Sequence, residues 1–381
     1  MIENKTIAVA GSGVMGLGIA QVAALNGNQT IIYDVSEDAL VVAAKRLEKD
    51  LEKATAKGKI SEEQKTKTTS LIVFSNNLKD LDRSALLIEA IPERLDLKLN
   101  FFAEIEALLN KDTIIASNTS SFSITVLGGK SRHPERFIGA HFFNPAHIMP
   151  LVEVVNTDFT STQVSTWVQD TLRSWGKIVV TAKDTPGFIV NRVARPFYCE
   201  ALRIVEEGIA DVSTVDHAMK TLGGFRMGPF ELMDLIGIDT NFSITCSMYE
   251  SYFHEARYRP SLIQQTMVDS GRLGRKSGKG FYNYGENAVK SQPQEDEELL
   301  KKIFERILCC LINEAAETYY CGVASIEDID LAVKKGVNYP QGLFEWGSEI
   351  GYGHCVEVLD SLFDFYHDPR YRVSAWLRNQ S

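Results

Sequence analysis

The sequence lacks the patterns that mark metal-bound, disulfide-bonded or membrane-spanning chains. Its six cysteines form no C-x-x-C pair and have no Cys/His spacing typical of a zinc site. No stretch reaches the length of about eighteen uncharged apolar residues that a membrane span needs. The segment "MIENKTIAVAGSG" has neither the basic region nor the cleavage site of a secretory leader. We therefore expect reduced thiols, no bound metal, no membrane partner and a cytoplasmic location.

The chain also has no long run of basic residues. Its 50 acidic and 40 basic residues give a net charge of −10 and are spread along the sequence. Nucleic-acid binding relies on clustered lysine and arginine, so we expect no nucleic-acid partner. The length of 381 residues is enough for two or three domains.

In the first half, short apolar runs alternate with amphipathic stretches. This alternation is typical of a parallel sheet covered by helices. Strands are predicted at residues 6–10, 29–34, 71–74, 85–91, 113–117, 136–143, 151–155 and 177–182. The pattern predicts an α/β fold with a doubly wound, Rossmann-type domain over residues 1–183.

The second half is predicted to be helical and contains a repeat. Asp-Thr-Pro-Gly at 184–187 ends the strand pattern. Residues 200–237 and 314–351 then superpose without a gap at an offset of 114, which pairs Glu200 with Glu314. We predict an all-α domain at 184–284, a polar linker, and a second copy of the domain at 297–381.

Three glycines follow the first strand in a G-x-G-x-x-G pattern. Gly11 allows a tight turn, Gly13 lets the backbone approach a pyrophosphate, and Gly16 lets helix and strand pack closely. The phosphates would then lie at the helix N-terminus, beside Val14 and Met15. A glycine-rich turn without a ligand is the alternative.

The second predicted strand ends in Asp34, about twenty residues further on, as this fingerprint requires. A carboxylate there bonds the two ribose hydroxyls and repels a 2′-phosphate. The sequence therefore favours NAD over NADP as the cofactor.

A histidine lies near the end of a predicted strand in "FIGAHFFNPAHIMPLVEV", residues 137–154. Such a residue, here His141, is often a core histidine. Glu153 is placed to return on the next strand and hold one ring nitrogen, so that the other can act as a base. Asn118 and Ser120 of "IASNTSS" are predicted at the same sheet edge. Together with a dinucleotide fold, these residues predict alcohol dehydrogenation.

Six segments carry a family resemblance. They are "AGSGVMGLGIAQ", "IEAIPERLDLK", "ASNTSS", "HFFNPAHIMPLVEVV", "DTPGFIVNR" and "GPFELMDLIG". In this order they resemble the 3-hydroxyacyl-CoA dehydrogenases, including bacterial 3-hydroxybutyryl-CoA dehydrogenases, over about residues 3 to 284. The resemblance implies NAD-dependent oxidation of an L-3-hydroxyacyl-CoA to the 3-ketoacyl-CoA in β-oxidation or a related CoA-linked route.

The resemblance also implies roles for individual residues. His141 would be the general base, Glu153 its orienting partner, and Ser120 and Asn191 the hydrogen-bonding partners of the substrate's C3 oxygen and its neighbours. A helix pair after the second strand would receive coenzyme A, with a contact at Lys57. The implied cofactor contacts are Asp34, Glu93, Lys98, Ser120, Asn144 and Lys276.

Each implied contact has a structural alternative. Glu93 and Lys98 sit where residues often decorate a helix start, and Ser120 is in a position typical of a cap. The alternative for Lys276 is a solvated turn, that for Lys57 is a solvated basic face, and that for Asn191 is a core amide. For the whole chain, the alternatives are a dehydrogenase of a free hydroxy acid or sugar acid, and a non-catalytic, crystallin-like NAD-binding protein.

The tail departs from the family, whose single-module members end near residue 284. The second copy has Glu305 at the position that corresponds to Asn191, so we expect a structural role for it. In the resembled family the helical domain forms the dimer contact. We expect the second copy to dock on the first and give a monomer with an internal pseudo-dimer, with a homodimer as the alternative.

Overall fold

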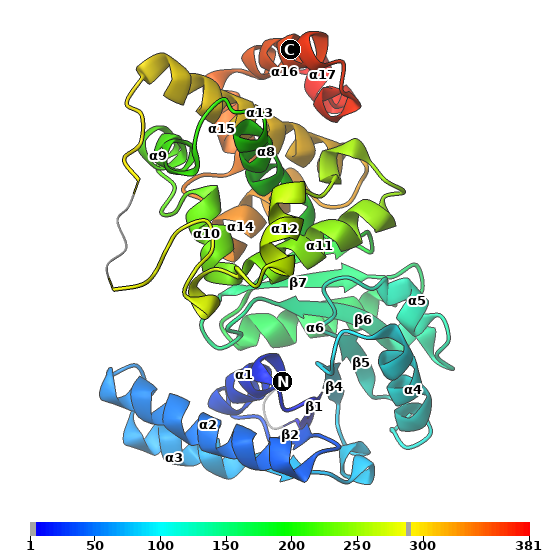
Figure 1. Ribbon diagram of the computed structural model, residues 1–381. Helices are drawn as coiled ribbons and strands as arrows, with labels where there is room; N and C mark the ends of the chain where they lie inside the picture. Colours follow the sequence, from blue (N-terminus) through cyan, green and yellow to red (C-terminus); the bar gives the residue numbers. More distant parts are fainter. Residues whose placement is uncertain (1–4, 287–290) are drawn as a thin grey trace. The chain divides into compact units, whose positions relative to one another are not determined.

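A computed structural model describes residues 5–286 and 291–381, and the chain forms two compact units, Met1–Thr185 and Pro186–Ser381 (Figure 1). The boundary lies two residues after the predicted one. Asp184 belongs to the first unit because its carboxylate accepts hydrogen bonds from Ile124 N at 3.1 Å and Thr125 N at 2.7 Å. These groups open the short helix α5 (Ile124–Gly128).

The first unit is built on one eight-stranded sheet in the order β3-β2-β1-β4-β5-β6-β7-β8. All eight predicted strands are present: β1 (Ile7–Ala10), β2 (Thr30–Tyr33), β3 (Ile72–Ser75), β4 (Leu86–Glu89), β5 (Ile114–Ser117), β6 (Phe137–Phe142), β7 (Leu151–Asn156) and β8 (Ile178–Lys183). Neighbouring strands run parallel except β6 and β7, which are antiparallel. The sheet is therefore mostly parallel, as the sequence pattern indicated, but it contains one antiparallel pair that the pattern did not predict. Residues 143–150 are too few for a helical crossover, which takes about a dozen residues or more.

Helices cover this sheet: α1 (Val14–Leu25), α2 (Glu37–Ala56), α3 (Glu62–Leu71), α4 (Leu95–Glu106), α5 and α6 (Thr162–Ser174), with the 3₁₀ turns η1 (Leu78–Leu81) and η2 (Pro134–Arg136). Helix α2 buries a stripe with helical spacing, made of Leu40, Ala43, Leu47 and Leu51. Ser36 caps α2, and a Ser61–Gln64 capping box opens α3. The two helices form the predicted pair after β2 and run side by side (Figure 1).

The second unit is helical. It contains α7 (Val190–Val193), α8 (Arg195–Glu206), α9 (Val212–Gly223), α10 (Pro229–Ile236), α11 (Ile238–Ser251), η3 (Ala256–Tyr258), α12 (Leu262–Asp269), η4 (Arg275–Ser277), α13 (Glu297–Tyr320), α14 (Ile326–Gly336), α15 (Leu343–Ile350), α16 (Tyr352–Tyr366), η5 (Pro369–Tyr371) and α17 (Ala375–Asn379). Helices α9, α10 and α11 recur as α14, α15 and α16 at the sequence offset of 114. One contact recurs with them. Asp216 accepts from Phe230 N and Asp330 accepts from Phe344 N, each at 2.9 Å.

Reciprocal buried clusters join the first copy, residues 186–284, to the second, residues 297–381. Glu314 of the second copy accepts from Arg192 Nε at 2.8 Å and from the Tyr258 hydroxyl at 2.6 Å. Glu200 of the first copy accepts from Arg306 Nε at 3.0 Å, and the Tyr371 hydroxyl donates to it at the same distance. Arg192 and Arg306 are 114 residues apart, as are the two glutamates. The contact therefore has the reciprocity of an isologous interface within one chain.

An apolar seam accompanies these clusters. The Phe225 ring of the first copy lies 5.0 Å from the Tyr339 ring and 5.4 Å from the Trp346 ring of the second copy. In the second copy, Val333, Leu343, Phe344 and Trp346 are buried, and Leu331 is half-buried. Both copies therefore belong to a single compact unit.

The predicted linker joins the copies, and its residues 287–290 lie outside the described residues. In its described part, Gln294 N donates to the Thr214 hydroxyl at 3.0 Å. Among the described residues, no helix is both long enough and apolar enough to cross a membrane.

The reciprocal clusters lead to a stability prediction. Burial alone would raise the pKa of Glu314, but Arg192 and Arg257 outweigh it and lower the pKa. Glu314→Gln leaves buried guanidinium groups uncompensated, so we expect a loss of about 3 kcal/mol or more in the free energy of unfolding. Urea-induced unfolding of the full chain measures this loss as a lower midpoint. Glu298→Gln, which breaks an exposed pair with Lys302, is the control and should leave the midpoint nearly unchanged. Equal midpoints for the two variants would contradict the role of Glu314.

Candidate active site

The glycine turn between β1 and α1 has the geometry of a phosphate-binding loop. Gly11 has φ +101°, and a Cβ at this position would collide with the Ala90 carbonyl oxygen. A Cβ at Gly16 would collide with the Gly11 carbonyl oxygen. At Gly13, by contrast, the place that a Cβ would take has no close contact with any described residue other than its neighbours in the chain. The turn therefore requires Gly11 and Gly16 for its shape and is open at Gly13.

Helix α1 begins at this open position. Gly13 has no side chain to cap the helix, and the first turn, with Val14 and Met15, contains no acidic residue. The N–H groups of a helix start attract anions, and such a start without a cap fits a pyrophosphate. The residues present thus fit a dinucleotide.

Asp34 follows β2 and lies beside the glycine turn. Its Oδ2 accepts from Ser12 N at 2.9 Å and from the Ser12 hydroxyl at 2.7 Å. Its Oδ1 accepts from Ser36 N at 3.1 Å. The carboxylate is therefore held next to the turn, at the position where this fold places the acid that binds ribose.

The central feature of the site is the pair formed by His141 and Glu153. These residues lie directly opposite each other on antiparallel β6 and β7, so their side chains project from the same face. His141 Nδ1 lies 2.6 Å from Glu153 Oε2, and the exposed fractions of the two residues are 6% and 0%. An ionised carboxylate only accepts hydrogen bonds, so Nδ1 carries the proton and Nε2 is the basic nitrogen. The pair thus fixes the tautomer expected of a base.

The loop after β5 is tied to the same strand end. Asn118 Oδ1 accepts from Phe142 N at 2.8 Å, one residue after His141. Glu93 holds the next residues of the loop, because its Oε1 accepts from the Thr119 hydroxyl at 2.6 Å and from Ser120 N at 3.0 Å. The structure therefore brings Ser120 to the edge of the sheet where His141 lies.

A buried ion cluster supports this loop. Lys98 Nζ lies 2.5 Å from Glu89 Oε1 and 3.1 Å from Glu93 Oε2, and only 1% of Lys98 is exposed. Burial raises the pKa of Glu89 despite Lys98. At Glu93, Lys98 and the loop hydroxyls outweigh burial and lower the pKa. The contacts of Lys98 are thus with two carboxylates of the protein, and its predicted cofactor contact stays a prediction.

Sequence reasoning missed Glu89 and Lys177. Glu89 is the last residue of β4, and the available signal was an acid at the end of an apolar run, the same signal that identified Asp34. Lys177 is buried, and its ammonium group donates to Ala146 O at 2.5 Å and to Met149 O at 2.8 Å. It thereby holds the connection 143–150, which carries the exposed Asn144. A single lysine before a strand gives no such signal.

The remaining predicted residues lie on other elements of the chain. Lys57 is exposed and follows α2 in the first unit. Asn191 is half-buried on α7 in the second unit, and its carbonyl oxygen accepts from Arg195 Nε at 3.2 Å. Lys276 of the second unit pairs with Asp239 at 2.6 Å. Sequence reasoning also missed Arg195, which donates to the Thr245 hydroxyl at 2.9 Å and anchors the helical turn that carries Asn191.

Lys177 gives a prediction of pH dependence. Burial lowers its pKa to about 8, against about 10.4 for an exposed lysine. Between these values the unfolded chain binds more protons than the folded chain, so this residue makes the free energy of unfolding rise with pH. We expect the wild type to gain stability relative to Lys177→Met between about pH 8 and pH 10. Urea midpoints across this range measure the gain, with the exposed Lys111→Met as the control. A wild-type-to-Met difference that stays constant with pH would exclude this effect.

Comparison with known proteins places the chain in a family. The model of the "3-hydroxyacyl-CoA dehydrogenase, NAD binding domain" matches residues 6–185. The model of the "3-hydroxyacyl-CoA dehydrogenase, C-terminal domain" matches residues 187–284 and 303–380. The second match thus extends over both helical copies.

Individual relatives agree with this assignment. The 3-hydroxyadipyl-CoA dehydrogenase of Escherichia coli K12 is 35% identical, with 100% of this chain and 98% of the relative covered. A 3-hydroxybutyryl-CoA dehydrogenase of Mycobacterium tuberculosis is 38% identical, with 74% of this chain and 98% of the relative covered. A crystal structure of a 3-hydroxybutyryl-CoA dehydrogenase from Escherichia coli K12 matches with a TM-score of 0.93 and 34% identity, covering 99% of this chain and 98% of that one. The chain belongs to the 3-hydroxyacyl-CoA dehydrogenase family and is an oxidoreductase with an NAD-binding domain.

Proposed function

We propose that this 3-hydroxyacyl-CoA dehydrogenase uses the His141–Glu153 pair as the general base in the oxidation of L-3-hydroxyacyl-CoA to 3-ketoacyl-CoA. The observation that carries the proposal is the 2.6 Å contact between His141 Nδ1 and a fully buried Glu153 carboxylate. A histidine held in this way presents Nε2 as the base and is stabilised when it becomes an imidazolium.

The reaction divides between the protein and its cofactor. His141 Nε2 takes the proton of the C3 hydroxyl, while Glu153 stabilises the positive charge that forms on the ring. When bound, NAD accepts the hydride that leaves C3. Ser120, on the loop held by Glu93, hydrogen-bonds the C3 oxygen, and Asn191 remains a predicted second partner of the substrate.

The substrate class follows from the family and from the relatives. Two relatives are named for 3-hydroxyadipyl-CoA and 3-hydroxybutyryl-CoA, which are both CoA thioesters. This favours a CoA thioester over a free hydroxy acid or a sugar acid, and catalysis over a non-catalytic NAD-binding role. The exposed Lys57 and its neighbours Lys53 and Lys59, at the turn of the helix pair α2–α3, supply positive charge for the phosphates of the carrier.

The reciprocal clusters support a proposal about assembly. Glu200 and Glu314 each bind an arginine and a tyrosine of the opposite copy, so the surface that an isologous dimer would use is covered within the chain. The full chain is then a monomer with an internal pseudo-dimer.

The base is tested by substitution. His141→Gln should lower kcat by about 10²–10⁴-fold, the usual size of a general-base contribution, and leave NAD affinity nearly unchanged. Glu153→Gln should also slow turnover, because the ring loses its orienting carboxylate. Steady-state kinetics and NAD titration measure both effects, with the exposed His133→Gln as the control. The proposal fails if His141→Gln keeps more than half of the activity.

Cofactor choice is tested at Asp34. Replacing Asp34 by Ser and the exposed Val35 by Arg should raise the ratio of NADP to NAD turnover, because repulsion of the 2′-phosphate is removed and a cation is supplied. Val35→Arg alone, which keeps Asp34, is the matched control and should change the ratio less. A wild type that already uses the two cofactors equally would show that Asp34 does not select NAD.

Assembly is tested by light scattering. A version that ends at Tyr284 loses the second copy, uncovers Glu200 and Phe225, and should dimerise or aggregate. The full chain should scatter as a monomer. Finding the same dimer with equal solubility for both would exclude the internal pseudo-dimer.

A further inference from the structure

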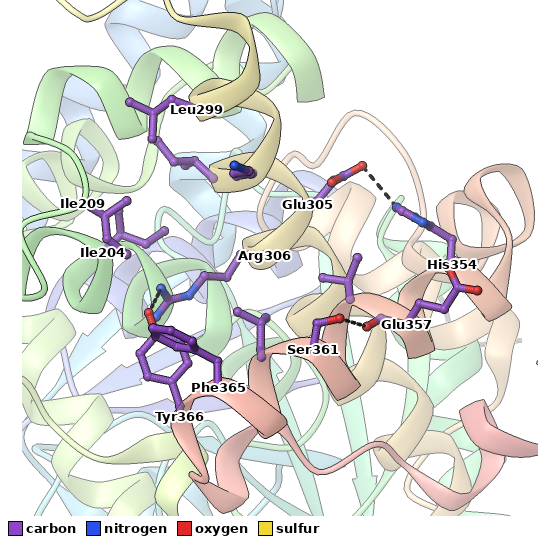
Figure 2. A pocket seen from close by; sticks show the side chains of 14 residues that line it. Ile204, Ile209, Leu299, Glu305, Arg306, His354, Glu357, Ser361, Phe365 and Tyr366 are labelled. Atoms are coloured by element: carbon purple, nitrogen blue, oxygen red, sulfur yellow. Dashed lines mark hydrogen bonds and ion pairs between the residues drawn. The ribbon is translucent and has the colours of Figure 1, made fainter.

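The second unit contains a cavity that the proposed reaction does not use. It has a volume of about 470 Å³ and is lined by the end of α8, the first half of α13 and one face of α16 (Figure 2). Small-molecule sites typically have volumes of about 300–1,000 Å³, so the cavity has the size of a ligand site.

The repeat gives this cavity a defined place in the fold. Glu305 on its wall occupies the position that corresponds to Asn191 of the first copy, at the offset of 114. His354 corresponds in the same way to Thr240, and Ser361 to Ser247. The hollow therefore lies on the second copy's counterpart of the helical face that carries Asn191.

The apolar residues Ile204, Ile209 and Leu299 lie on one side of the cavity, next to the Arg306–Tyr366 pair, and the polar His354–Glu305 pair lies on the other side (Figure 2). The apolar residues come from α8 and the turn that follows it, from α13 and from α16: Ile204, Ile209, Leu299, Ile303, Val358, Leu362 and Phe365. At the polar side, His354 Nε2 lies 3.1 Å from Glu305 Oε1. This pair offers both hydrogen-bond donors and acceptors to a ligand head group.

The charges in the lining disfavour an anionic ligand. Arg306 is already held by Glu200 at 3.0 Å and by Glu207 at 2.8 Å, so its charge is compensated within the protein. Lys302 pairs with Glu298 at 2.7 Å on the surface. The carboxylates of Glu305, which pairs with Lys301 at 3.7 Å, and of Glu357 also belong to the lining, so the lining offers a ligand carboxylate two negative groups and two cations that already have partners.

We propose that this cavity binds a neutral amphiphile, with an apolar chain that ends in a hydroxyl or amide group. The chain lies against Ile204, Ile303 and Val358, and the head group bonds the His354–Glu305 pair. The site is additional to the proposed reaction and does not depend on it.

The test uses the full chain and three probes with eight carbons, namely 1-octanol, octanamide and octanoate. Calorimetry measures affinity and the number of sites in the wild type and in Val358→Trp, whose indole would occupy the place proposed for the apolar chain of the ligand. The matched control is Leu222→Trp, an exposed position of the first copy. We expect the alcohol and the amide to have one site fewer in Val358→Trp than in the wild type and the control.

Head-group selectivity is the second measurement. Octanoate should bind the cavity about two- to fivefold more weakly than 1-octanol, as expected for repulsion between partly exposed charges. His354→Leu should weaken the binding of the alcohol and the amide and leave the binding of octanoate unchanged.

If Val358→Trp does not fold, Ser361→Trp blocks the cavity from the same helix, α16. Equal numbers of sites in the wild type and a folded blocked variant, or octanoate bound as tightly as octanol, would overturn the proposal. Turnover should be the same in the wild type, Val358→Trp and Leu222→Trp, so loss of binding at the cavity is distinguished from loss of the dehydrogenase reaction.

Discussion

The candidate active site depends on one feature of the sheet, the reversal of direction between β6 and β7. Because these strands are antiparallel and in register, His141 and Glu153 face each other across the pair. A shift of one residue would turn one side chain to the opposite face of the sheet. The positions of His141 and Glu153 are therefore fixed by the backbone hydrogen bonds of the strand pair, not by a loop. The short connection that forces the reversal also carries Asn144, and Lys177 holds it through two carbonyl oxygens.

Holding the site in place requires buried charges, which lose favourable hydration. A lysine and a glutamate taken out of water are stable only when each has a close partner, and Lys98 and Glu89 meet this condition at 2.5 Å. The cluster continues through Glu93 to the loop that carries Ser120. Removing the cluster in favour of apolar residues would save desolvation energy but would release the loop. We infer that the charges are there for position more than for stability.

The sequence was sufficient for features that local patterns encode. Apolar runs located all eight strands, and the repeat located the helices of the second copy in advance. Glycine spacing identified the phosphate turn because only glycine fits at Gly11 and Gly16. The antiparallel pair was missed because a strand pattern has no direction, and Lys177 was missed because its partners are carbonyl oxygens about thirty residues away. Positions of this kind depend on packing between distant segments, which composition and periodicity do not describe.

The duplication shows separately two features that occur together in the first copy, the interface between the copies and the hydrogen-bond network next to Asn191. The interface is preserved on both sides, since Glu200 and Glu314 each bind an arginine and a tyrosine of the opposite copy. The polar network below Asn191 is not. Arg195, Asn241 and Thr245 are linked by hydrogen bonds in the first copy, whereas the corresponding positions of the second copy are the buried residues Cys309, Cys355 and Leu359. An interface needs both halves, whereas the role proposed for Asn191 needs only the first copy, and in the second copy apolar packing takes the place of the network. The corresponding face of the second copy has Glu305 in place of the asparagine and borders the cavity. Glu305 and His354 give that cavity a hydrogen-bonded pair of ionisable groups that the first copy does not have at these positions.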